Sequence, residues 1–256
     1  MNETTSGFDW RDGIADLALE GRGYPETAEP YTRLPATFKD VVTKSVWDLS
    51  RTTIGFHVRF TTDSDEIAVR WKVPPETQPP AYFTVMFFCG IDIYARGEDG
   101  VWRHRSAAAP DFATGEGEFH LPWTPGEECM VYLPIRVRPE RFAVGVKEGA
   151  SFLPPRPRAT SRPVVHYGTS IVNGGMASRP GLVFPSIMSR LADVEVVNFG
   201  FSGAGRMELP MADVVAGVDA LPNDDDCTMD HCHPNDYGFA QMGRVYADAV
   251  KGILGK

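Results

Sequence analysis

The stretch DHCHPND, residues 230–236, gathers side chains that can move protons or bind a metal ion. Asp230 and His233 are three positions apart, a spacing that lets the carboxylate accept a hydrogen bond from the imidazole within one turn. Such a bond fixes the tautomer of the ring and stabilises the imidazolium that forms when the ring takes a proton from a hydroxyl group. The pair therefore predicts a general base with its orienting acid, and Pro234 marks the start of a supporting helix.

A metal site is the competing interpretation of the same stretch. Cys227, His231, Cys232 and His233 are all chemically capable ligands. Structural zinc sites usually take their ligands as two separated pairs, whereas three adjacent residues cannot easily converge on one ion. We therefore expect no metal here, and we interpret His231 and Cys232 as loop neighbours of the base.

A general base needs a nucleophile, and Ser170 is the candidate. It comes directly after the apolar run VVHYGT and shortly before a glycine pair, so we expect it at the carboxyl end of a strand. Open parallel sheets collect their functional groups at that edge. Because a serine hydroxyl is a poor nucleophile without a base, a serine that merely caps a loop is the alternative.

A second glycine-rich turn, NFGFSGAG at residues 198–205, also follows an apolar run. Gly200, Gly203 and Gly205 permit a positive φ and let backbone N–H groups approach a ligand, which is what an oxyanion hole requires. A dinucleotide site is the weaker interpretation, because the G-x-G-x-x-G order and an acidic residue after the next strand are not convincingly present.

The elements that must position these residues alternate along the carboxyl-terminal half. VVHYGTS and VEVVNFG are typical of buried strands, and GLVFPSIMSRLA between them has helical spacing. A further helix is predicted from about Pro210, and a last helix over residues 235–254. The apolar face of that last helix is expected to hold Phe239, Met242, Val245, Tyr246, Ala249, Val250 and Ile253. Strands that alternate with helices predict a parallel sheet in a three-layer α/β domain.

The amino-terminal half has a different pattern. Over residues 46–146, about seven or eight short runs rich in β-branched and aromatic residues alternate with polar turns, which predicts an antiparallel β-sandwich or jelly roll. The stretch GASFLPPRPRATSRP, residues 149–163, is rich in proline and arginine and has no periodicity. We interpret it as a linker between two domains.

Together the three chemical features resemble the SGNH, or GDSL-like, hydrolases, which are serine esterases and acyltransferases with a flavodoxin-like fold. YGTSIVNGG looks like their first block, with Ser170 as the nucleophile whose N–H also serves the oxyanion hole. NFGFSGAG looks like the second, with Gly203 as an oxyanion donor, and DHCHPND like the last, with Asp230 and His233 as acid and base.

The amino-terminal half resembles the β-sandwich of the branch of this family that is marked by a G-x-D-L-Y motif. Here the motif reads GIDIY, at residues 90–94. The resemblance implies a jelly-roll-like sandwich over residues 1–148, the linker at 149–163 and an SGNH-like hydrolase domain at 164–256.

The hydrolase domain departs from the family in its length. The third block of this branch is similar to a D-C-L-P-N turn, and DALPND at residues 219–224 is its only counterpart, with Asn223 as the oxyanion side chain. Nine residues then separate Asn223 from His233, where the family has at least one more strand and helix. A complete five-stranded sheet needs roughly 150 residues, so we expect an internally shortened domain.

The resemblance implies hydrolysis of small acyl esters, such as acetyl esters of carbohydrates, through an acyl-enzyme and without a cofactor. Transfer of the acyl group to an alcohol or sugar hydroxyl would use the same residues. A catalytically impaired module that binds carbohydrate or protein is a further alternative, for which Trp102 and Trp123 are candidate contacts unless they are core residues. The sequence encodes neither the acyl group nor the oligomeric state legibly.

The composition limits the partners. The formal net charge of −9 disfavours nucleic acid and anionic membranes. The first residues, MNETTSGFDW, are polar and acidic where a signal peptide would be basic and then apolar, and no later run approaches a membrane span, so we expect a cytoplasmic protein. Four cysteines in 256 residues do not make a disulfide framework.

Overall fold

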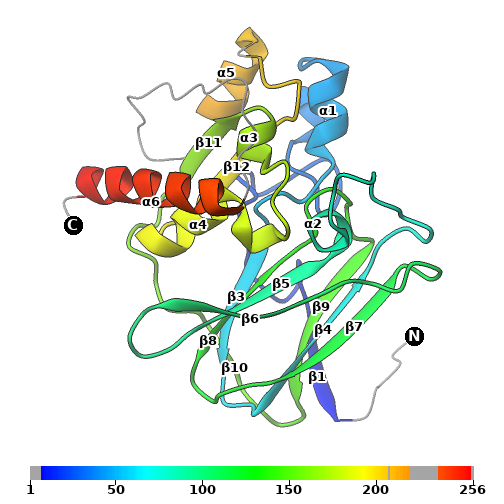
Figure 1. The fold of residues 1–256 in the computed structure, drawn as a ribbon, viewed down its shortest axis with the longest axis vertical. Helices are drawn as coiled ribbons and strands as arrows, with labels where there is room; N and C mark the ends of the chain where they lie inside the picture. Colours follow the sequence, from blue (N-terminus) through cyan, green and yellow to red (C-terminus); the bar gives the residue numbers. More distant parts are fainter. Residues whose placement is uncertain (1–6, 207, 219–235, 255–256) are drawn as a thin grey trace.

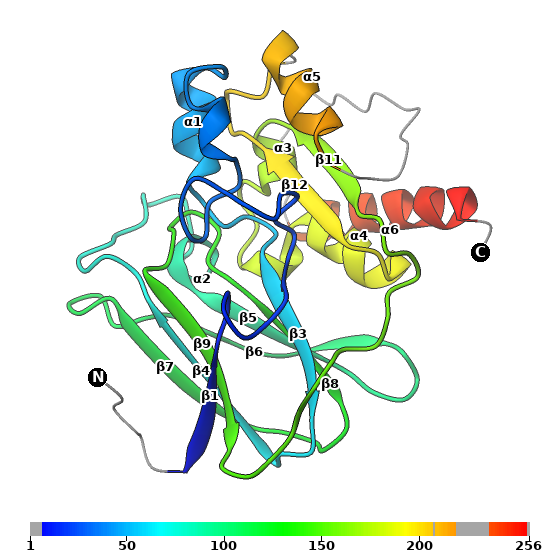
Figure 2. The same cartoon turned by 180° about the vertical axis from the view of Figure 1, so that it is seen from behind.

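The computed structural model of the chain describes residues 7–206, 208–218 and 236–254. An antiparallel β-sandwich occupies one end of the molecule, and a short parallel sheet with helices on both faces occupies the other (Figures 1 and 2). Both expected layer architectures are therefore present, in the expected chain order. No helix among the described residues is long and apolar enough to cross a bilayer.

The sandwich consists of two sheets whose paired strands all run antiparallel. The first sheet has the order β1 (Phe8–Asp12), β9 (Arg141–Lys147), β4 (Glu66–Lys72) and β7 (Glu116–Pro122). The second has the order β10 (Phe152–Leu153), β3 (His57–Thr62), β8 (Glu128–Tyr132), β5 (Ile91–Arg96) and β6 (Trp102–Ala108), and β2 (Leu19–Glu20) also pairs with β3. The predicted alternation of strands and turns accounts for this half.

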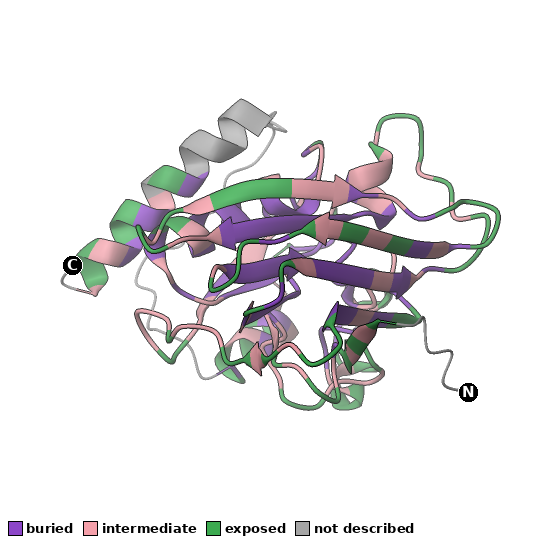
Figure 3. Cartoon of the chain, turned by 90° about the horizontal axis from the view of Figure 1, so that it is seen from below, coloured by how far each residue is buried: buried purple, intermediate pink, exposed green. Residues whose placement is uncertain are grey.

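Side-chain alternation along β5 shows how the second sheet is buried on both faces. Ile91, Ile93 and Ala95 point into the core between the two sheets. Asp92 and Tyr94 point the other way, yet they are 0% and 4% exposed, because the helical half of the molecule covers that face. Buried positions accordingly run along the central strands in Figure 3, with exposed positions on an outer strand and in the loops.

Two short helices lie in the amino-terminal half, and one of them replaces a predicted strand. Residues 44–50 form α1 (Lys44–Ser50), and the start of the YFTVMFFC run forms α2 (Val85–Cys89). Each begins at a threonine whose Oγ1 accepts a hydrogen bond from an N–H of the first turn, at 3.3 Å for Thr43 and 3.1 Å for Thr84. The strand prediction is wrong at the start of the YFTVMFFC run, residues 82–89, because local capping outweighed the β propensity of the run.

The parallel sheet pairs β11 (Val164–Gly168) with β12 (Val196–Gly200), as predicted. On one face lie α4 (Phe184–Ala192) and α6 (Asp236–Ile253), and on the other lie α1 and α5 (Leu209–Ala216) (Figures 1 and 2). Three single-turn elements complete the described helices: α3 (Ser170–Asn173) and the 3-10 turns Ala36–Phe38 and Pro180–Leu182. The three-layer prediction is thus confirmed, in a domain with two described strands.

The buried face of α6 differs in part from the predicted one. Gly243, Ala247 and Val250 are buried, and Tyr246 is partly buried, a spacing that forms one stripe against α4. Ala249 and Ile253 are instead exposed, so the prediction that they lie on the buried face is wrong.

Neither of the two tryptophans proposed as surface contacts, Trp102 and Trp123, is fully exposed to solvent. Trp123 belongs to the sandwich core and is 5% exposed. Trp102 is partly buried and packs against Tyr94, Met130 and Tyr132. The two therefore do not form an exposed aromatic platform.

Candidate active site

Ser170 lies where strand turns into helix. Strand β11 ends at Gly168, and Ser170 is the first residue of α3. The helix lasts a single turn: the Asn173 N–H donates to the Thr169 carbonyl at 3.0 Å, and Gly174 ends the turn with φ of 82°. The serine is half-buried, and its own N–H belongs to the open first turn of the helix.

Gly203 lies at the corresponding place after the neighbouring strand. The loop that follows β12 folds back on itself, since the Ala204 and Gly205 N–H groups both donate to the Phe201 carbonyl at 2.8 Å. Gly203 has φ of 73° and is exposed, with open space where a side chain would project. No acceptor among the described residues takes the Gly203 N–H, which is therefore available to a ligand.

The parallel register brings the two turns together. Gly168 pairs with Gly200, so Ser170 and Gly203 leave the sheet at the same edge, two and three residues later. The contact is direct: the Phe201 N–H donates to the Gly168 carbonyl at 2.8 Å, and a Cβ on Gly205 would overlap that same oxygen. Only glycine fits at position 205.

Two buried asparagines connect the Ser170 turn to the end of β12 by hydrogen bonds. Asn198 accepts from the Gly200 N–H at 2.8 Å and donates to the Val172 carbonyl at 2.7 Å. Asn173 donates to the Gly200 carbonyl at 3.3 Å. Both asparagines lie within the quoted motifs, but the sequence assigned them no role, since nothing in the local pattern shows that their amides join β12 to α3.

The other predicted site residues, Asp230, His233 and Asn223, lie outside the described residues, as do Cys227, His231, Cys232 and Pro234. The structure therefore brings together Ser170 and Gly203 of the five. Among the described residues, no cluster of histidine, cysteine and acidic side chains could hold a metal ion. Cys89 and Cys129 are free and buried, and burial raises the pKa of both thiols, to about 11 for Cys89.

Comparison with known families decides what kind of protein carries this arrangement. Residues 8–152 match the GxDLY family, the amino-terminal region of SGNH hydrolase-type esterases, and residues 161–223 match the GDSL-like lipase/acylhydrolase family. The first match covers more than half of the chain. The chain belongs to the SGNH/GDSL-like hydrolases with a GxDLY domain.

Solved structures agree with this SGNH hydrolase assignment. A Bacteroides ovatus protein described as a GDSL-like lipase is 26% identical, with a TM-score of 0.75 over 94% of this chain and 72% of that one. A salicylyl-acyltransferase of a tetracycline biosynthetic pathway (17% identity, TM-score 0.59, 86% of this chain and 59% of that one) shares the fold. A family two carbohydrate esterase from Cellvibrio japonicus also shares the fold, at 8% identity and a TM-score of 0.52 over 97% of this chain and 98% of that one. No curated protein matches the sequence.

The GxDLY-type motif of this SGNH hydrolase joins its two halves. Arg179, from the loop after α3, donates through Nη1 to both carboxylate oxygens of Asp92, at 2.9 and 2.8 Å, and to the Tyr94 hydroxyl at 2.8 Å. The Gly181 N–H donates to Asp92 at 2.8 Å. Burial raises the pKa of Tyr94 to about 12, so its hydroxyl stays protonated. The motif thus fixes the loop that follows the nucleophile turn, a role that its sequence did not reveal.

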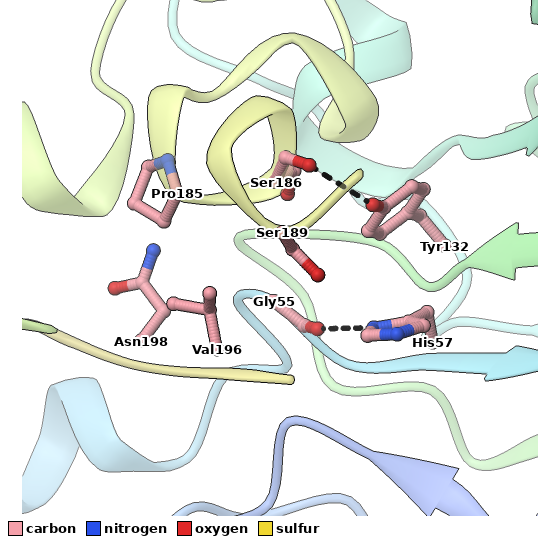
Figure 4. Close-up of a pocket in the computed structure, with 8 residues that line it drawn as sticks. All are labelled: Gly55, His57, Tyr132, Pro185, Ser186, Ser189, Val196 and Asn198. Atoms are coloured by element: carbon pink, nitrogen blue, oxygen red, sulfur yellow. Dashed lines mark hydrogen bonds between the residues drawn. The ribbon is translucent and has the colours of Figure 1, made fainter. Parts of the chain in front are cut away.

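A small cavity lies between the halves, away from Ser170. It has room for about one water molecule, and the side chains that surround it come from β3, β8, α4 and β12 (Figure 4). Its lining residues are Gly55, His57, Tyr132, Pro185, Ser186, Ser189, Val196 and Asn198. The His57 Nδ1 donates to the Gly55 carbonyl at 2.9 Å while Nε2 faces the Arg158 guanidinium at 2.8 Å. This space is too small for a substrate.

Proposed function

We propose that this SGNH hydrolase is a serine esterase that cleaves small acyl esters through an acyl-enzyme on Ser170. The observation that carries the proposal is the placement of Ser170 and Gly203 at one edge of the parallel sheet, with no acceptor among the described residues for the Gly203 N–H. An ester carbonyl attacked by Ser170 would find oxyanion donors within the same pair of turns. The family assignment independently supports ester hydrolysis.

The base in this proposal is His233, oriented by Asp230. His233 precedes Asp236, the first residue of α6, by three positions. Gly243 of α6 packs against Ile187 and Phe184 at the start of α4, so the amino end of α6 extends past that of α4. The proposal requires His233 to reach Ser170 from this helix end.

The reaction begins when His233 removes the proton from Ser170, whose Oγ attacks the ester carbonyl. The N–H groups of Ser170 and Gly203, with the Asn223 side chain as a third donor, stabilise the oxyanion, each by about 3 kcal/mol. Collapse of the intermediate expels the alcohol, which takes the proton from His233. Water, activated by the same histidine, then releases the acid and restores the serine. The mechanism requires no cofactor.

Acetyl esters of carbohydrates are the substrate class we propose, following the family resemblance and the carbohydrate esterase among the structural neighbours. One protein that shares the fold is by its name a salicylyl-acyltransferase, and the same residues would serve acyl transfer to an alcohol or sugar hydroxyl here. Adding methanol or a sugar during p-nitrophenyl acetate turnover, and measuring transesterified product against acetate, separates transfer from hydrolysis.

Replacement of the nucleophile tests the proposal. Ser170→Ala should lower p-nitrophenyl acetate turnover by at least about 10³-fold, because the acyl-enzyme cannot form. It should also abolish labelling by a fluorophosphonate probe. Ser202→Ala is the matched control, since Ser202 is a half-buried serine of the neighbouring loop and should keep most of the activity. Unchanged turnover or labelling in Ser170→Ala would exclude this residue as the nucleophile.

A further inference from the structure

Arg33 is a completely buried arginine beneath the oxyanion turn. It is 0% exposed, and its guanidinium donates from Nη1 to the carbonyls of Asn198 and Gly200 at 2.9 and 3.0 Å. Nη2 donates to the Leu49 carbonyl at 2.6 Å. The guanidinium also lies 4.5 Å from the centre of the Phe201 ring. Arg33, from the amino-terminal part of the chain, thus contacts the end of β12 and also Phe201, the first residue of the loop that contains Gly203.

Arg136 is linked to the same carbonyl, that of Gly200, through Asn173. Its Nη1 donates to Asn173 Oδ1 at 3.0 Å, and its guanidinium lies 5.5 Å from the Phe83 ring centre. Asn173 links Arg136 to β12, because its Nδ2 donates to the Gly200 carbonyl at 3.3 Å. Asn173 ends the single-turn helix that Ser170 begins. A continuous chain of hydrogen bonds therefore joins the two arginines through the nucleophile helix and the last residue of β12.

These two cations differ from Arg59, a buried arginine whose Nη1 lies 2.6 Å from Glu128 Oε1. Neither Arg33 nor Arg136 has a carboxylate within 4.0 Å among the described residues, although the chain has 34 acidic residues against 25 basic ones. Burial, and secondarily the charge of Arg136, lowers the pKa of Arg33 to about 9, so its guanidinium is still charged at neutral pH. Burying a charge without a counter-charge lowers the stability of the fold. We therefore expect these two arginines to have a role other than stabilisation.

We propose that Arg33 and Arg136 are positioning residues of the oxyanion hole. They act through the Gly200 carbonyl and the Asn173 amide, and they hold the N–H groups of Ser170 and Gly203 in fixed relation to each other. Their positive charge, which no carboxylate among the described residues neutralises, also favours the anionic intermediate over the neutral ester. This inference rests on the proposed esterase function, which the experiment below tests separately.

Arg136 is the better residue for mutation, because it is only partly buried and methionine retains most of its volume. Arg136→Met should lower kcat for p-nitrophenyl acetate by about tenfold to a hundredfold and leave KM within about twofold, since the lost stabilisation is specific to the transition state. Arg136→Lys, which restores a donor and the charge, should recover part of the loss. A KM effect alone would overturn the inference.

Arg138→Met is the matched control. Arg138 lies two residues further along the same segment and pairs with Glu29 rather than with the site. Its kcat should stay within about twofold of the parent protein. An equal loss of kcat in Arg138→Met and Arg136→Met would overturn the inference, since it would indicate a general effect of weakening this segment.

Amide hydrogen exchange supplies a readout that does not depend on activity. Peptides covering residues 168–175 and 198–205 should exchange faster in Arg136→Met than in Arg138→Met, while sandwich peptides stay the same. If the parent protein fails to hydrolyse esters or react with the fluorophosphonate, the proposed function fails and the exchange data still decide the positioning role. Unchanged exchange in both peptides would overturn it.

Discussion

His166 is a buried histidine of β11 that has no part in the proposed chemistry. It is 8% exposed, and its ring packs edge-on against Phe184 and Tyr246, with centroid distances of 4.8 and 4.9 Å. Burial lowers the pKa of His166 to about 4, from a usual value near 6.5. The folded state therefore holds this ring neutral over a pH range in which the unfolded chain protonates it.

The sign of the resulting pH dependence follows from linkage. Above pH 6.5 both states are neutral and the stability is complete; as the pH falls from about 6.5 to 4, the unfolded state takes up a proton that the folded state does not. The free energy of unfolding should fall by about 2 kcal/mol between pH 7 and pH 5. Urea denaturation at both pH values measures it.

The control for this prediction is His166→Phe, which keeps a ring among the aromatic neighbours. Its stability difference between pH 7 and pH 5 should be smaller than that of the parent by about 2 kcal/mol. Paired carboxylates lose their stabilisation mostly below pH 5, so they contribute little in this window. An equally steep fall in the variant would rule out His166 as the cause.

At the scale of elements, the contact between β5 and the loop after α3 is a buried ion pair. The Asp92 side chain is 0% exposed and that of Arg179 is 20% exposed. His104 Nε2 lies 3.1 Å from the same carboxylate. Removing Arg179 would leave Asp92 buried with its main counter-charge gone, a loss that typically costs about 3–5 kcal/mol.

A double-mutant cycle tests this contact. Arg179→Met should lower the free energy of unfolding by about 3 kcal/mol, and Asp92→Asn by a similar amount. The double variant should be clearly less destabilised than the sum of the two, because each single change leaves the other partner unpaired. Strict additivity in urea denaturation would show that the two side chains do not interact.

The same strand shows how far the sequence predicts the elements. Alternation in GIDIY and its neighbours predicts strands, and the strands are there, because period two follows from the backbone itself. It does not predict what covers Asp92, since a polar position on an alternating strand usually faces solvent. The loop that covers Asp92 contains Arg179, which is 87 residues away in the sequence. No local sequence pattern predicts such a contact.

The candidate site divides in the same way. Ser170 and Gly203 could be predicted because their turns directly follow apolar runs, and parallel strands place such turns at one edge. Arg33 and Arg136 could not, because each reaches the site only through tertiary contacts. The roles of Asp230, His233 and Asn223 stay predictions.

At the scale of the whole molecule, the amino-terminal part contributes to both halves. The segment from Tyr24 to Ser50 leaves the sandwich and packs on the face of the parallel sheet that α5 shares (Figure 2). The Tyr24 hydroxyl donates to the Val214 carbonyl in α5 at 2.5 Å. The shared core consists of Leu34, Val42, Val46, Val165, Val197, Phe199, Phe201, Ala204, Met211, Val214 and Val218. The α/β half therefore depends on residues that lie between β2 and β3 of the sandwich.

This interlocking predicts that residues 154–256 do not fold alone. Without Leu34, Val42 and Val46, the apolar face of β11 and β12 beside α5 would be open to water, and Gly200 would lose its bond from Arg33. We expect the fragment to show no cooperative transition by circular dichroism in urea. Adding residues 1–153 as a separate chain should restore a cooperative transition, because it supplies the missing layer. Cooperative unfolding of the fragment by itself would show instead that α5 alone covers that face well enough.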